Sequence, residues 1–85
     1  MREIVFKPIA LKQYINWAKT DSNIQKKIDA LLGDIINTPF DGIGKPEPLK
    51  QNLKGHWSRR ITKEHRLVYQ VTKNSIIIIS CKFHY

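Results

Sequence analysis

The sequence carries a set of ionisable side chains that together could cleave RNA. The set combines a carboxylate held between two prolines, several cations, a histidine near the chain end and a terminal tyrosine: Glu47, Lys50, Arg60, Arg66, Lys82, His84 and Tyr85. One group of such a set can take the proton from a ribose 2′-hydroxyl, and another can protonate the departing 5′-oxygen. Cations then stabilise the extra charge on the phosphate in the transition state. No metal ion is required for this chemistry.

Other chemistries have less support in the sequence. His56, His65 and His84 are widely spaced, and no Cys or His pair has zinc-ligand spacing. A glycine-rich phosphate loop is missing, and Ser58 lacks the context of a nucleophile elbow. We therefore expect neither a metal nor a cofactor, and we interpret His56 and His65 as structural.

The charge is concentrated in the second half of the chain. The formal net charge is +8. Residues 1–43 hold six Lys/Arg and five Asp/Glu, whereas residues 44–85 hold nine Lys/Arg and two Asp/Glu. This asymmetry favours a polyanion-binding half beside a scaffold half. Two alternatives remain at this point, a basic face that serves solubility and a surface for an acidic protein partner.

Length and composition indicate one small domain. A chain of 85 residues has room for a single core, so residues 1–85 are expected to form one domain. The apolar runs are too short for a membrane span, and the first residues do not read as a signal peptide. The single cysteine, Cys81, is interpreted as an apolar filler and suits a reducing compartment. The expected location is therefore the cytoplasm, with no membrane contact.

The first half predicts a strand and two helices. Residues 2–6 suit a strand, and Leu11, Tyr14, Ile15 and Ala18 form a helical apolar stripe that ends near Thr20 and Asp21. Ser22 and Gln25 have the spacing of a capping box for a second helix. Its apolar stripe is Ile24, Ile28, Leu31, Leu32, Ile35 and Ile36.

The second half predicts a loop and then antiparallel strands. Residues 38–48 contain three prolines and two glycines, which exclude a helix. Strands follow at 56–61, 65–71 and 76–85, with a turn at 72–75 and an optional short strand at 49–53. The order is β-α-α-β-β-β, an α+β domain with both helices on one face of a mainly antiparallel sheet. The opposite face should stay open and gather Arg60, Arg66, Lys82 and His84.

Several motifs resemble one toxin family along nearly the whole chain. These are GKPEPLK at 44–50, WSRRI at 57–61, EHRLVY at 64–69 and the terminal HY, together with TD at 20–21 and TPF at 38–40. In this order they resemble the YoeB/Txe branch of the RelE-type toxins of bacterial toxin–antitoxin systems. The resemblance implies the RelE-like fold and a toxin that enters the ribosomal A site and cuts mRNA there.

The resemblance also implies a role for each site residue. Glu47 matches the general base, His84 the general acid, Arg66 the transition-state arginine and Tyr85 the residue that orients the substrate. Lys50 and Arg60 match positions that hold the phosphate backbone. The implied products are a 2′,3′-cyclic phosphate and a 5′-hydroxyl.

The implied partners are mRNA, the ribosome and a cognate antitoxin. A basic active face would suit an antitoxin segment that is acidic, partly disordered and folds on binding. A homodimer is also compatible with the resemblance. Two other functions compete with RNA cleavage: a non-catalytic toxin of the same fold that inhibits gyrase, and a plain RNA-binding module. The joint presence of Glu47, Arg66, His84 and Tyr85 argues against the gyrase inhibitor.

Overall fold

The computed structural model describes residues 2–50 and 55–83. Within them the elements follow in the order β1 (Glu3–Phe6), α1 (Pro8–Thr20), α2 (Ser22–Asn37), β2 (Glu47–Pro48), β3 (His56–Arg60), β4 (Arg66–Val71) and β5 (Ser75–Ser80). The predicted α+β class and β-α-α-β-β-β order are confirmed, with β2 as the additional short strand. This strand precedes the predicted position at 49–53, of which residues 51–54 lie outside the described part of the chain.

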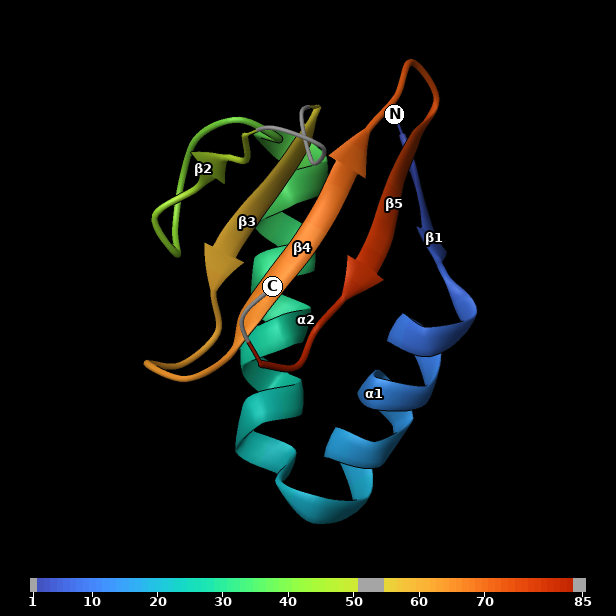
Figure 1. Cartoon of the computed structure of the whole chain (residues 1–85), viewed down its shortest axis with the longest axis vertical. Coiled ribbons are helices and arrows are strands. Elements are labelled where there is room, and N and C mark those ends of the chain that lie inside the picture. The colour runs from blue at the N-terminus through green and yellow to red at the C-terminus, as the bar shows by residue number, and fades with distance from the viewer. Residues whose placement is uncertain (1, 51–54, 84–85) are drawn as a thin grey trace.

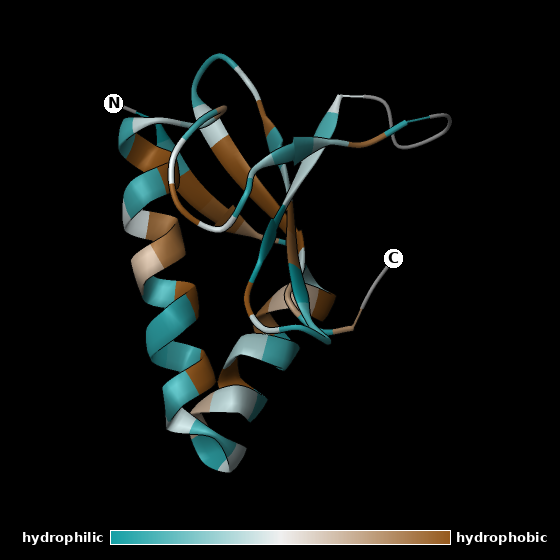
Figure 2. Ribbon diagram, turned by 90° about the vertical axis from the view of Figure 1, so that its left-hand side faces the viewer, coloured by the Kyte–Doolittle hydropathy of each residue, from teal (hydrophilic) through white to brown (hydrophobic). Residues whose placement is uncertain are grey.

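The strands form one sheet in the order β1-β5-β4-β3-β2. β1 pairs with β5 in parallel, and the remaining pairs are antiparallel. α2 runs along one face of the sheet, and α1 packs near the C-terminal end of β5 (Figure 1). Seen from the side, both helices lie on the same side of the sheet (Figure 2). The two helices follow β1 in the chain and cover one face of the sheet (Figure 2). No helix of the described residues covers the other face.

The second helix supplies much of the core. Ile28, Leu31 and Ile35 are fully buried, as predicted from their spacing. They belong to one cluster with sheet residues that include Leu67 and Ile78. Fully burying a side chain of this size contributes roughly 1.5–3 kcal/mol. Neither helix of the described residues has the length and apolar character that a membrane crossing needs.

The first helix is rotated relative to the predicted stripe, of which only Tyr14 packs against the core. Leu11 and Ile15 are 44% and 47% exposed, whereas Ala10 and Trp17 are buried. The reason is a contact with the end of the sheet, because the Trp17 indole donates a hydrogen bond to the Cys81 carbonyl at 2.9 Å. That contact rotates the helix so that its bulkiest side chain, and not the aliphatic stripe, faces inward.

The capping residue also differs from the prediction. Asp21, not Ser22, is the N-cap of α2, and its carboxylate accepts hydrogen bonds from the amides of Asn23 and Ile24. Ser22 is already the first helical residue. The capping-box interpretation was therefore wrong by one position, because α1 ends at Thr20 and leaves Asp21 alone in an extended conformation between the two helices.

The last strand is shorter than predicted. The sequence indicated a strand over 76–85, but β5 ends at Ser80. Beyond it the Cys81 amide donates to the Gln13 side chain at 2.7 Å, and the Cys81 carbonyl accepts from Trp17. These bonds to α1 replace strand pairing and redirect the chain. Phe83, which lies beyond the end of β5, is 54% exposed.

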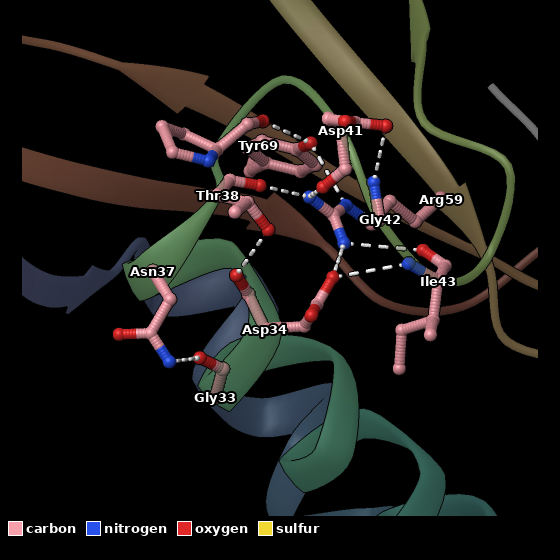
Figure 3. Close-up of polar contacts among 10 residues, drawn as sticks. Gly33, Asp34, Asn37, Thr38, Asp41, Gly42, Ile43, Arg59 and Tyr69 are labelled. Atoms are coloured by element: carbon pink, nitrogen blue, oxygen red, sulfur yellow. Dashed lines mark hydrogen bonds and ion pairs between the residues drawn. The ribbon is translucent and has the colours of Figure 1, made fainter.

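A buried guanidinium fixes the loop between α2 and β2. Arg59, the penultimate residue of β3, is fully buried and points toward the helices (Figure 3). Its five N–H donors all have acceptors: the Asp34 carboxylate (2.5 Å), the Tyr69 hydroxyl (3.1 Å), and the carbonyls of Ile43 (3.1 Å), Thr38 (2.6 Å) and Asp41 (2.8 Å). A guanidinium has five N–H groups, so its hydrogen-bonding capacity is completely used.

Two neighbours complete this Arg59 cluster. Burial raises the pKa of Tyr69, so its hydroxyl stays protonated and donates to the Pro39 carbonyl at 2.8 Å. The Asp34 carboxylate also accepts from the Ile43 amide at 3.0 Å. Gly42 has a φ of +118°, and an added Cβ would overlap the Asp34 carboxylate. The loop thus has a single shape although it contains neither helix nor strand.

The cap of α2 gives a direct test of the corrected helix start. Asp21→Ala removes the acceptor of two amides and should lower the free energy of unfolding by about 1 kcal/mol. Ser22→Ala, the matched control at the next position, should change it by less than about 0.5 kcal/mol. Denaturant unfolding of both variants measures the difference. A larger loss for Ser22→Ala would restore the capping box.

The Arg59–Asp34 pair predicts an acid-sensitive stability. The hydrogen bond from Arg59, then that from the Ile43 amide, lowers the pKa of Asp34 in the folded protein. A carboxyl whose folded pKa lies below its unfolded pKa contributes stability above the unfolded value, and that stability is lost as the pH falls through the folded value. Asp34→Asn should therefore destabilise the protein at neutral pH, and its difference from the parent should shrink below about pH 4. Denaturant unfolding across the acid range measures this, and a pH-independent difference would contradict it.

Candidate active site

Strand register brings three of the predicted site residues to one face of the sheet. Glu47 lies opposite Ser58 in the β2–β3 pair, and Arg60 lies opposite Arg66 in the β3–β4 pair. Directly opposed residues share a face, and so do residues two positions apart on one strand. Since Ser58 and Arg60 are two positions apart, Glu47, Arg60 and Arg66 all lie on the face away from the helices.

The strand pairing also sets the spacing of Glu47 and Arg60 on this face. Glu47 and Arg60 are diagonal neighbours across an antiparallel pair, a relation in which Cα atoms lie roughly 7–8 Å apart. Glu47 and Arg60 are both exposed. The face is not open throughout, however, because Ser58 and Val68 between these residues are 4% and 2% exposed. The predicted open face is therefore limited to a rim of charged side chains around a buried centre.

Two arginines face each other without an intervening residue. Arg60 and Arg66 are directly opposed in the strand pairing, a position at which like charges are unfavourable. One Arg66 nitrogen, Nη1, donates to the carbonyls of Thr62 (3.0 Å), Lys63 (3.3 Å) and His65 (3.3 Å). Its Nε and Nη2 make no hydrogen bond to residues 2–50 or 55–83. The turn before β4 thus orients the guanidinium through Nη1, and within the described ranges the other two nitrogens have no acceptor.

Backbone contacts hold the segment that carries Glu47. The Gly44 carbonyl accepts from the Arg60 amide at 2.7 Å, and the Leu49 amide donates to the His56 carbonyl at 2.9 Å. These bonds tie the chain to β3 on both sides of Glu47. Lys50 follows and is exposed. The loop therefore presents Glu47 from a segment anchored to the strand that carries Arg60.

The structure does not place the other members of the predicted set on this face. Lys82 follows the end of β5, and its Nζ lies 5.6 Å from the centre of the Trp17 ring and 5.2 Å from that of Phe83. Its predicted position on the strand face was wrong. β5 ends at Ser80, so the alternation of side chains between the two faces does not extend to Lys82. His84 and Tyr85 lie outside the described residues.

Sequence reasoning missed two residues that support this site. Arg59 was given no role, although alternation with Arg60 places it on the core side of β3, where a charged residue is itself a signal for a buried partner. His65 was interpreted as structural, but its specific contact was not foreseen: its Nδ1 accepts the Phe83 amide at 2.8 Å. Both partners are distant in sequence, which is why spacing alone could not reveal them.

Two other features concern reactivity and metal binding. Burial raises the pKa of the Cys81 thiol to about 11, so the thiolate is scarce at neutral pH. Cys81 is therefore an apolar filler that also bonds to α1. In the described part of the chain, no three His, Cys, Asp or Glu side chains gather closely enough to hold a metal ion.

Comparison with known proteins shows the family. The family model described as YoeB-like toxin of bacterial type II toxin–antitoxin system matches residues 6–85. Toxin YoeB of Escherichia coli K12 is 60% identical over 72 residues, which cover 85% of this chain and 86% of that protein. A solved YoeB dimer from Staphylococcus aureus is 49% identical with a TM-score of 0.93, covering 99% of this chain and 98% of that one. A YoeB–YefM complex from the same organism is 48% identical with a TM-score of 0.91, covering 100% and 99%.

The agreement spans sequence and backbone, and it includes the segments that carry Glu47, Arg60 and Arg66. The resemblance inferred from the motifs is thereby confirmed. The chain belongs to the YoeB-like toxins of bacterial type II toxin–antitoxin systems.

Proposed function

We propose that this toxin is an endoribonuclease that cuts mRNA in the ribosomal A site and so blocks translation. The observation that carries the proposal is the register of β2, β3 and β4. It sets one carboxylate, Glu47, on the same face as the opposed pair Arg60 and Arg66. A base beside paired cations is the arrangement that attack by a 2′-hydroxyl on its own phosphodiester needs.

In the proposed reaction Glu47 takes the proton from the 2′-hydroxyl, and the freed oxygen attacks the adjacent phosphorus. Arg66 holds the phosphate oxygens as charge accumulates on them, with its Nε and Nη2 donors facing the group. His84 gives a proton to the departing 5′-oxygen, and Tyr85 orients the substrate. The products are a 2′,3′-cyclic phosphate and a 5′-hydroxyl, and no metal or cofactor takes part.

Lys50 and Arg60 bind the phosphate backbone in this proposal. Both are exposed, so each can reach a phosphate. An anion between Arg60 and Arg66 would also relieve their mutual repulsion. Binding and sheet stability are thus coupled, because the ligand removes an unfavourable interaction of the free protein.

The proposed regulator is a cognate antitoxin in the bacterial cytoplasm. The related YoeB of Staphylococcus aureus has been solved in complex with YefM. The net charge of +8 here favours a partner segment that is acidic and folds on binding. The Staphylococcus aureus relative has also been solved as a dimer, and a homodimer is proposed for this chain on the same basis.

The base can be tested with a near-isosteric change. Glu47→Gln keeps the side-chain shape but cannot accept the proton, so cleavage should fall by about 10²-fold or more. Glu3→Gln, an exposed acid on the opposite edge strand β1, is the matched control and should cleave like the parent. The assay uses purified ribosomes programmed with a short mRNA and follows cleavage by primer extension. Cleavage by Glu47→Gln within a few-fold of the parent would remove Glu47 from the mechanism.

The arginine can be tested by separating binding from catalysis. Arg66→Lys keeps the charge but loses the planar pair of donors, so kcat should decline strongly while affinity for programmed ribosomes changes little. Lys50→Ala should show the reverse: weaker binding, a shallower dependence of affinity on salt, and a nearly unchanged kcat. Thermal unfolding of both variants controls for loss of the Nη1 contacts. A parallel loss of binding and kcat in Arg66→Lys would make Arg66 a binding residue only.

A further inference from the structure

The chain leaves the sheet after β5 by a defined route. Cys81 is fully buried, and three hydrogen bonds join it to α1: its amide to Gln13 (2.7 Å), its carbonyl from Trp17 (2.9 Å) and its thiol to the Ala10 carbonyl (3.6 Å). These bonds fix the point at which the chain turns away from β5. The next residues return toward the start of β4.

Phe83 is held at the end of this route by its backbone and not by burial of its ring. Its φ of +60° lies in the left-handed region, which is unusual for an aromatic residue. The ring is 54% exposed, so apolar burial contributes little to holding it. Both backbone groups are bonded, however: the amide donates to His65 Nδ1 at 2.8 Å, and the carbonyl accepts from the Arg66 amide at 3.2 Å.

His65 is itself rigidly placed. Its side chain is buried, and its ring lies edge-on to Trp17 with the centroids 4.8 Å apart. Its amide donates to the Thr62 hydroxyl, and its carbonyl accepts from the amides of Ile61 and Thr62. Since Nδ1 accepts a hydrogen bond, the proton of the neutral ring is on Nε2. The imidazole is therefore a fixed acceptor for the segment that arrives from β5.

We propose that His65 is a positioning residue, whose Nδ1 anchors the Phe83 amide and thereby delivers the chain end to the strand that carries Arg66. The inference rests on the proposed nuclease function, in which His84 and Tyr85 act. One peptide bond joins His84 to Phe83, so fixing Phe83 restricts where the proposed acid can lie. His65 acts through this backbone bond and does not touch the substrate.

Two substitutions separate positioning from simple structural support. His65→Asn keeps an acceptor near the place of Nδ1 but loses the ring that packs against Trp17. His65→Leu fills much of the ring volume but has no acceptor. If His65 positions the chain end, stability and activity should change in opposite directions in the two variants. His65→Asn should be the less stable variant in thermal unfolding and yet the more active, whereas His65→Leu should be the more stable and lose about 10²-fold in kcat, the scale on which a displaced group slows a reaction.

The decisive readouts are kcat and KM on programmed ribosomes and the hydrogen exchange rate of the Phe83 amide. His65→Leu should speed exchange at Phe83 and reduce kcat while KM changes little, and His65→Asn should keep both close to the parent. Activity that simply follows thermal stability in the two variants would overturn the proposal. An unchanged Phe83 exchange rate in His65→Leu would overturn it as well.

The exchange measurement also keeps this proposal distinct from the proposed function. If the parent protein does not cleave RNA, the nuclease proposal fails in the parent itself. The anchoring of Phe83 is then still decided by its exchange rate in the two variants, because that measurement does not depend on activity.

Discussion

The buried guanidinium of Arg59 is the interaction on which the architecture of the site depends. A buried cation is costly unless every donor is satisfied, and here one carboxylate, one hydroxyl and three carbonyls satisfy all five. Four of these five acceptors belong to the end of α2 or to the loop after it. Arg59 therefore connects β3 to the helix and gives a fixed shape to a segment that cannot form regular structure.

This constraint reaches the functional face through the chain. The loop that Arg59 fixes on the helix side of the sheet continues directly into β2, where Glu47 emerges on the opposite side. Arg59 points inward and Arg60 outward because side chains alternate along a strand. The two adjacent arginines therefore have different roles. Arg59 stabilises the scaffold, whereas Arg60 lies opposite Arg66 on the other face. A similar division holds at the start of β4, where His65 accepts a hydrogen bond from the returning chain and Arg66 lies on the face proposed to bind RNA.

The sequence allowed prediction of the elements and of the residues that alternation assigns to each face. The stripe of α2 and the turn at Thr72–Ser75 appear as predicted, because periodicity and local turn chemistry determine them. The errors arose where distant contacts decide the outcome. Trp17 rotates α1 through its bond to Cys81, and the same contacts end β5 early. No local pattern contains the partners of Arg59 or His65, which lie up to 25 residues away.

The central claim is that the charged face built on this scaffold cuts mRNA during translation. Mapping of RNA 5′ ends after brief expression of the chain in bacteria tests it most directly. The account predicts new 5′-hydroxyl ends inside translated mRNAs, appearing with the parent and disappearing with Glu47→Gln. Intact mRNA accompanied by DNA damage would contradict it and indicate a gyrase inhibitor. Intact mRNA and intact DNA, with RNA binding alone, would contradict it equally.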